Sequence, residues 1–110
     1  MPESLASKIR SLNDAFRLTF VGGRVMVTDG VTALPDAIKA RALSTVRAFA
    51  EFNHENDPHG EHDFGSFEVA GQKFFWKIDY YDKSLDGGSE DPADPAVTTR
   101  VLTIMLASEY

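Results

Sequence analysis

The chain has 110 residues, of which 43% are hydrophobic and 25% charged, and it contains no cysteine. This length and composition predict a single globular domain over residues 1–110, and the missing thiols exclude disulfides, cysteine nucleophiles and Cys-ligated zinc. The first 20 residues mix charged and apolar side chains without a long apolar run. We therefore expect no signal peptide, no membrane contact and a cytoplasmic location.

The acidic charge is concentrated in the middle of the sequence. The formal net charge is −6. The segment from Glu51 to Asp94 holds twelve acidic residues against three lysines, a net charge of −9, and the rest of the chain carries +3. Such a segment repels phosphate, so we expect no direct binding of nucleic acid. A solvated surface, a bound cation or a partner protein with a basic surface agrees better with this charge.

The N-terminal half predicts two helices separated by one strand. Apolar residues at helical spacing predict an amphipathic helix over residues 3–18, and Gly22-Gly23 ends that pattern. Residues 24–28 favour a strand, and the following Asp29-Gly30 pair predicts a tight hairpin turn. Pro35 and Asp36 indicate the start of a second helix, over residues 35–51.

The C-terminal half predicts a sheet. Residues 65–69 and 72–81 alternate apolar and polar side chains around a two-residue turn, which predicts a hairpin with Glu68 opposite Lys73 and Gly65 opposite Trp76. Residues 97–106 are rich in β-branched side chains and predict a closing strand. The expected fold is α+β, with two helices packed on one face of a mostly antiparallel sheet that contains a central β-hairpin.

Titratable side chains gather in one segment, residues 53–63, just before this hairpin. Imidazole and carboxylate groups are suitable ligands for a divalent metal, and we name His59, His62 and Asp63 as the candidate ligands. The spacing matches no established metal motif, so a polar connector of turns is the alternative. The register places His62 near Asp79, where the pair could act as a general base or as a structural hydrogen bond. The complete candidate set is His54, Asp57, His59, Glu61, His62, Asp63 and Asp79.

A second oxygen-rich segment resembles a calcium-binding loop only at its start. Asp82, Ser84, Asp86 and Gly87 occupy the first, third, fifth and sixth positions, but Ala93 stands where that loop needs a bidentate Glu. We therefore expect no calcium site there, and no cofactor other than the divalent metal considered above.

Five segments that extend over nearly the whole chain resemble a small bacterial family, domain-of-unknown-function family 3768: residues 12–16, 22–25, 56–65, 75–82 and 98–106. The resemblance implies a short stand-alone protein of the kind often encoded on plasmids near conjugation genes. It implies no activity and no catalytic residues.

Three functions agree with these observations, and the least specific of them is a stable scaffold with one peptide-binding sheet edge. The first is a non-enzymatic interaction or accessory module, linked to mobile elements or to evasion of host defence, whose acidic segment engages a basic protein surface. The alternative is a metal-dependent hydrolase that uses the segment of residues 53–63.

Overall fold

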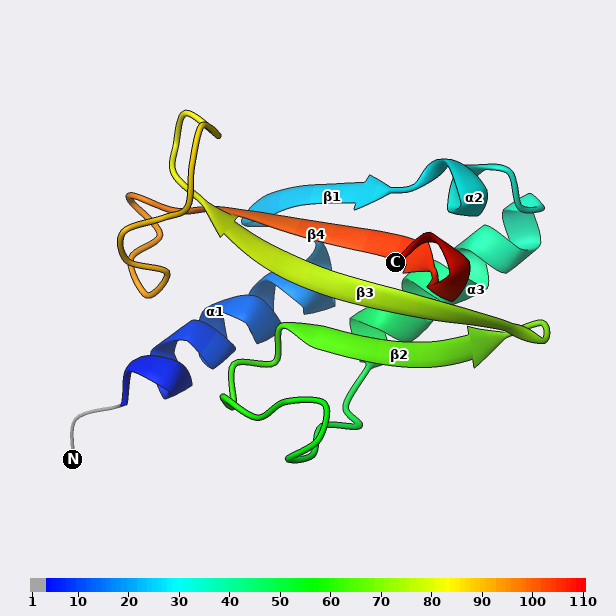
Figure 1. The fold of residues 1–110 in the computed structure, drawn as a ribbon, viewed down its shortest axis with the longest axis horizontal. Coiled ribbons are helices and arrows are strands. Elements are labelled where there is room, and N and C mark those ends of the chain that lie inside the picture. The colour runs from blue at the N-terminus through cyan, green and yellow to red at the C-terminus, as the bar shows by residue number, and fades with distance from the viewer. Residues whose placement is uncertain (1–3) are drawn as a thin grey trace.

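The computed structural model describes residues 4–110, so Glu3, where the first predicted helix begins, lies outside the described residues. The fold is α+β, as predicted, with two long helices on one face of a four-stranded sheet (Figure 1). In chain order the elements are α1 (Leu5–Thr19), β1 (Gly23–Val27), α2 (Asp29–Thr32), α3 (Asp36–Ala48), β2 (Phe64–Val69), β3 (Gln72–Tyr81), β4 (Thr99–Leu106) and the 3-10 helix η1 (Ala107–Glu109).

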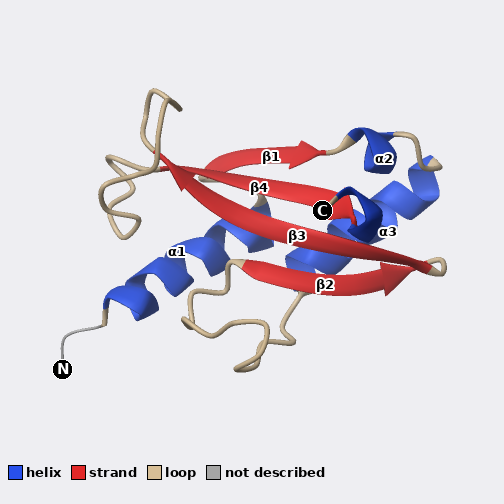
Figure 2. Ribbon diagram, in the orientation of Figure 1, coloured by secondary structure: helices blue, strands red, loops and turns tan. Residues whose placement is uncertain are grey.

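The strands are ordered β1-β4-β3-β2, and two of the three pairings are antiparallel (Figure 2). The β2–β3 hairpin has the predicted register, with Glu68 opposite Lys73 and Gly65 opposite Trp76. Its turn residues Ala70 and Gly71 have φ values of 53° and 78°, which a tight turn between strands requires. The predicted C-terminal strand forms as β4 and lies between β3 and β1.

The predicted hairpin turn at Asp29-Gly30 is wrong. These two residues begin the short helix α2, which buries Val31 in the core. The strand before them, β1, pairs with β4 in parallel. A strand in a parallel pair needs a crossover rather than a tight reversal, so the chain leaves β1 through α2 and crosses to α3.

The second predicted helix forms as α3 but ends at Ala48 instead of Glu51. The guanidinium of Arg17, which belongs to α1, donates from Nη1 to the carbonyl oxygens of Val46 and Phe49, at 3.0 and 2.7 Å. A cation at a helix C-terminus satisfies carbonyl groups that have no partner within the helix. The contact from α1 therefore caps α3.

The core lies between the helices and the sheet. Phe16 of α1 and Val46 of α3 pack against Trp76, Leu102 and Ile104 of the two inner strands. All five are buried to 2% exposure or less, so the tryptophan is a core residue, as the sequence indicates. Within residues 4–110, no helix combines the length and apolar character needed to cross a membrane.

Candidate functional site

Two acidic loops carry the charge that the sequence concentrates in the middle of the chain. The first acidic loop, residues 49–63, joins α3 to β2 and contains five carboxylates and no Lys or Arg. The second acidic loop, residues 82–98, joins β3 to β4 and contains five carboxylates and one lysine. The hairpin between them carries two acidic and two basic side chains. The entire charge of −9 therefore lies in the two loops.

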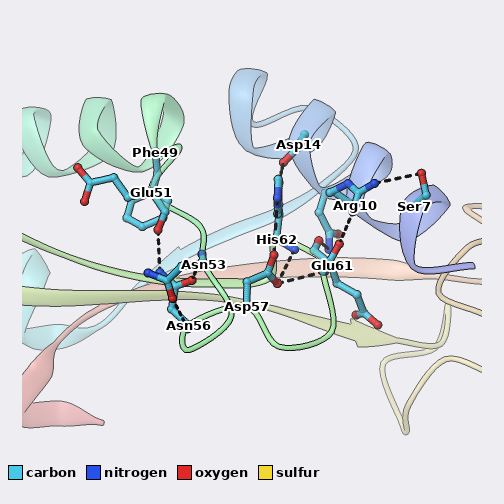
Figure 3. A network of polar contacts seen from close by, with 12 residues as sticks. Ser7, Arg10, Asp14, Phe49, Glu51, Asn53, Asn56, Asp57, Glu61 and His62 are labelled. Atoms are coloured by element: carbon cyan, nitrogen blue, oxygen red, sulfur yellow. Dashed lines mark hydrogen bonds and ion pairs between the residues drawn. The ribbon is translucent and has the colours of Figure 1, made fainter. Parts of the chain in front are cut away.

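The first acidic loop is a series of side-chain-capped turns (Figure 3). The amide oxygen of Asn53 accepts hydrogen bonds from the backbone N–H groups of residues 55 and 56. The carboxylate of Asp57 is buried and accepts from the N–H groups of Glu61 and His62, each at 3.1 Å. The polar-connector interpretation of residues 53–63 therefore describes much of this segment.

His62 lies between two carboxylates, and neither is the predicted one. Its Nδ1 is 2.8 Å from Asp14 Oδ1 of α1, and its Nε2 is 3.6 Å from Asp57 Oδ2. The imidazole stacks on the Phe52 ring, with 3.7 Å between ring centroids (Figure 3 shows the histidine between Asp14 and Asp57). Both ring nitrogens therefore face carboxylates of this chain.

The predicted closeness of His62 to Asp79 is wrong. Asp79 lies 3.0 Å from Lys77 Nζ. It points away from the helices, because the next residue, Tyr80, bonds to α1 and neighbouring side chains of a strand face opposite sides. His62 has a positive φ of 54°, and this conformation directs its ring toward α1. The register correctly predicts that the chain near His62 runs beside β3. The side chains of His62 and Asp79, however, point to opposite faces of the sheet.

The predicted metal ligands are only partly brought together. His54, His59 and His62 border one hollow of about 440 Å³, beside Phe52 and Asp57. Asp63 does not line this hollow. Among residues 4–110, no three or more His, Asp or Glu side chains are arranged to hold a metal ion. The described geometry therefore gives no support to the predicted set of His59, His62 and Asp63.

A buried polar network that the sequence reasoning missed connects α1 with both acidic loops. Asn13 is fully buried, and its Oδ1 accepts from Arg100 Nε at 2.7 Å. Its amide nitrogen donates to the Glu61 carbonyl oxygen at 2.9 Å and to the Tyr80 hydroxyl at 2.8 Å. The Tyr80 hydroxyl in turn donates to the Glu61 carboxylate at 2.8 Å. This single amide thus anchors the first acidic loop to the helix.

The second acidic loop is attached to the same network through Arg100. This arginine of β4 is 3% exposed, and one terminal nitrogen donates to the Pro92 carbonyl oxygen. Its guanidinium lies over the Tyr80 ring. Both loops are therefore held against one end of the sheet by Asn13 and Arg100.

Burial changes the protonation equilibria in this network. Desolvation raises the pKa of the Tyr80 hydroxyl far above its ordinary value and lowers the pKa of Arg100. Burial, and next the neighbouring Glu61 carboxylate, raise the pKa of Asp63. The raised pKa favours the neutral hydroxyl, which donates to the Glu61 carboxylate.

One sequence signal could have revealed the network. Ile9 and Phe16 mark the buried stripe of α1, and Asn13 and Arg17 occupy the same stripe at helical spacing. Arg17 is charged, yet it is 4% exposed and bonds to Asp14 and the end of α3. Polar residues within an apolar stripe predict buried hydrogen bonds.

The elements and contacts define a small α+β domain with a mixed four-stranded sheet and two acidic loops held by a buried polar network. A family model described as "Protein of unknown function (DUF3768)" matches residues 27–109, and the chain belongs to this family, as the resemblance predicted. Segments 12–16 and 22–25 of that resemblance lie outside the matched range. No curated protein and no solved structure matches the chain.

Proposed function

We propose that the protein is a non-enzymatic interaction module whose two acidic loops bind a basic surface of a partner protein. The observation that carries this proposal is the attachment of both loops to one buried network. Asn13 holds the first loop at Glu61, and Arg100 holds the second at Pro92. Carboxylates on loops held in this way need little further ordering when they bind, and preorganisation of this kind favours affinity.

The exposed carboxylates support the same proposal. Ten acidic residues lie in the two loops, and these five are exposed: Glu51, Glu55, Asp86, Glu90 and Asp91. Opposite charges across an interface accelerate encounter and exclude partners of the wrong sign. We therefore expect a partner rich in Lys and Arg.

The array of loop carboxylates also indicates which class of protein the partner belongs to. An array of carboxylates can imitate the phosphates of DNA, so a protein that normally binds DNA is a suitable partner. Such a partner would also agree with a role in mobile elements or in evasion of host defence. This part of the proposal predicts that duplex DNA competes with the protein for the same partner.

Metal-dependent hydrolysis is the weaker alternative. The ring nitrogens of His62 are 2.8 and 3.6 Å from two carboxylates, and Asp63, the acidic residue among the three predicted metal ligands, does not line the hollow beside it. Titration of the untagged protein with zinc and manganese tests this alternative. A thermal shift that disappears in His59→Ala would support a metal site.

The interaction proposal is tested by capture of partners on the immobilised wild-type protein and on two triple variants. The first variant, Glu55→Gln/Asp86→Asn/Glu90→Gln, neutralises exposed loop carboxylates. The control, Asp29→Asn/Asp36→Asn/Glu68→Gln, makes the same change of net charge outside the loops. We expect the first variant, but not the control, to lose the partners that the wild type binds.

Salt and DNA give the second part of this test. Raising the salt from about 0.1 M to about 0.5 M shortens the screening length to a few ångströms and should release the captured partner. Duplex DNA should elute it at low salt if the partner is a DNA-binding protein. Capture that persists in high salt, or that both variants lose equally, would contradict the proposal.

A further inference from the structure

The outer edge of β1 is an open row of backbone hydrogen-bonding groups. Within residues 4–110, β1 is the first strand in the sheet order and pairs only with β4 (Figure 1). The Thr28 N–H donates to the Ile104 carbonyl, so alternation along the strand directs the N–H and C=O groups of Arg24 and Met26 toward β4. The corresponding groups of Gly23, Val25 and Val27 therefore point to the open edge.

The side chains along this edge are unusually apolar for a solvent-facing strand. Val21, Met26 and Val27 are 74%, 56% and 41% exposed. The strand contains no proline and no lysine, and its one charged side chain is Arg24. Charged residues and proline are the common protection of an open edge in natural sheets.

We propose that β1 pairs antiparallel with β1 of a second copy of this chain, about a two-fold axis at Val25, to form one continuous eight-stranded sheet. This inference does not rest on the proposed function, because β1 contains no residue of either acidic loop.

The register follows from which backbone groups face outward. In an antiparallel pair, two opposed residues exchange both hydrogen bonds only if the groups of both point toward the partner strand. Centring the axis on Val25 pairs all five residues of β1, with Val25 opposite its own copy and Gly23 opposite Val27. All the outward groups then find partners.

Side-chain shape agrees with this register. Val27 of one copy lies opposite Gly23 of the other, where no side chain competes for the space. Arg24 lies opposite Met26, so that the aliphatic stem of the arginine covers the exposed thioether. A two-fold axis repeats each of these contacts, as an isologous interface requires.

The charges near the axis also agree with the proposed register. Arg24 is exposed, and within the described part of the chain no carboxylate forms an ion pair with it. In the proposed register its two diagonal neighbours are Arg24 and Thr28 of the second copy, and the Thr28 hydroxyl donates to the Glu109 carboxylate at 2.6 Å. A long side chain reaches a diagonal cross-strand neighbour. The pairing thus brings each Arg24 toward the Glu109 of the other copy, and the two Glu109 carboxylates offset the repulsion between the two arginines across the axis.

Sedimentation equilibrium of the wild type, Arg24→Glu and Arg41→Glu tests the proposal. Arg41 is exposed on α3, so Arg41→Glu makes the same charge change away from β1. From about 10 µM to about 1 mM we expect the wild-type mass to rise from 12.1 kDa toward twice that value. Arg24→Glu should weaken this association at least about tenfold, and Arg41→Glu less than about twofold.

Amide hydrogen exchange locates the interface independently of these variants. The amides of Gly23, Val25 and Val27 should exchange quickly in dilute protein and slowly in concentrated protein. Those of Arg24 and Met26 should be protected at both concentrations, because they bond to β4 within one copy. A monomer throughout this range, an equal effect of both variants, or a dimer without new protection at residues 23, 25 and 27 would overturn the proposal.

Discussion

Asn13 is the residue on which the arrangement of the candidate site depends most. Its one side-chain amide makes three hydrogen bonds, to Arg100, Tyr80 and the backbone of Glu61. It is completely buried, so water cannot replace these bonds when the amide is removed. Removing the amide therefore destabilises the protein, because it leaves buried polar groups, including the charged Arg100, without a hydrogen-bond partner.

We expect Asn13→Ala to lower the free energy of unfolding by about 3 kcal/mol, since it leaves Arg100 and Tyr80 without their shared partner. Urea denaturation measures this change. Ser11→Ala, at an exposed position of the same helix, is the control and should change stability by less than about 0.5 kcal/mol. A loss of similar size in both variants would show that the network contributes little.

Asp63 is predicted to oppose folding at neutral pH. Burial, followed by the Glu61 carboxylate, raises its pKa, so the native state favours the protonated acid. The proton on Asp63 therefore stabilises the native state. This stabilisation is complete only at a pH below the unfolded pKa of about 4, and it is lost as the pH rises through the native pKa of Asp63. Ionised Asp63 at pH 7 therefore destabilises the native state.

Asp63→Asn should accordingly be more stable than the wild type at pH 7, and this advantage should shrink as the pH falls toward 3. Denaturant midpoints at several pH values measure the difference. Asp36→Asn, at an exposed ion pair with Lys39, should show no such gain. An Asp63→Asn variant that is less stable than the wild type at pH 7 would contradict this assignment.

At the scale of elements, β2 and β3 meet α3 at Gly65. This glycine lies opposite Trp76, and a Cβ at this position would come 2.7 Å from the Phe49 ring and overlap the indole nitrogen. Neither aromatic ring can move easily, because Trp76 is completely buried and Phe49 is 8% exposed. The glycine therefore sets the closeness of the α3 end to the hairpin.

Gly65→Ala is expected to destabilise the domain by about 2–3 kcal/mol through overpacking. Thermal or urea denaturation measures this loss. The matched control is Gly87→Ala in the second acidic loop, where the nearest atom would be an ordinary 3.7 Å away. If the two alanine variants are equally stable, the rings adjust to the added methyl group and the spacing is not fixed by Gly65.

At the scale of the whole molecule, the two acidic loops place like charges at one end of the sheet. The polar network draws them together, since Asn13 bonds to one loop and to the arginine that holds the other. Repulsion between the carboxylates should then destabilise the native state, and salt should screen it.

We expect the thermal midpoint of the wild type to rise by about 2–4 °C between about 0.05 M and about 0.5 M sodium chloride. Glu55→Gln/Asp86→Asn/Glu90→Gln should respond less, because it lacks three of the repelling carboxylates. Asp29→Asn/Asp36→Asn/Glu68→Gln should respond as the wild type does. A midpoint that falls with salt would mean that attractive ion pairs outweigh the repulsion.

The sequence by itself determined the α+β class, the long helices and the β2–β3 hairpin with its register. Each depends on neighbouring residues: helical spacing in α1, the alternation around Ala70 and Gly71, and proline at the start of α3. The concentration of charge between Glu51 and Asp94, and the family resemblance, were also visible without a structure.

Only the tertiary structure decided the parallel pairing of β1 with β4 and the partners of His62. The paired residues of β1 and β4, such as Gly23 and Arg100, lie 77 positions apart in the sequence, and no local pattern specifies which distant strand completes a sheet. His62 meets Asp14 across 48 positions of the sequence because the loop turns toward α1, not along β3. The packing of the folded chain determines which side chains meet across such a separation. The sequence therefore indicated that residues 53–63 form a polar loop, but not which residues His62 contacts.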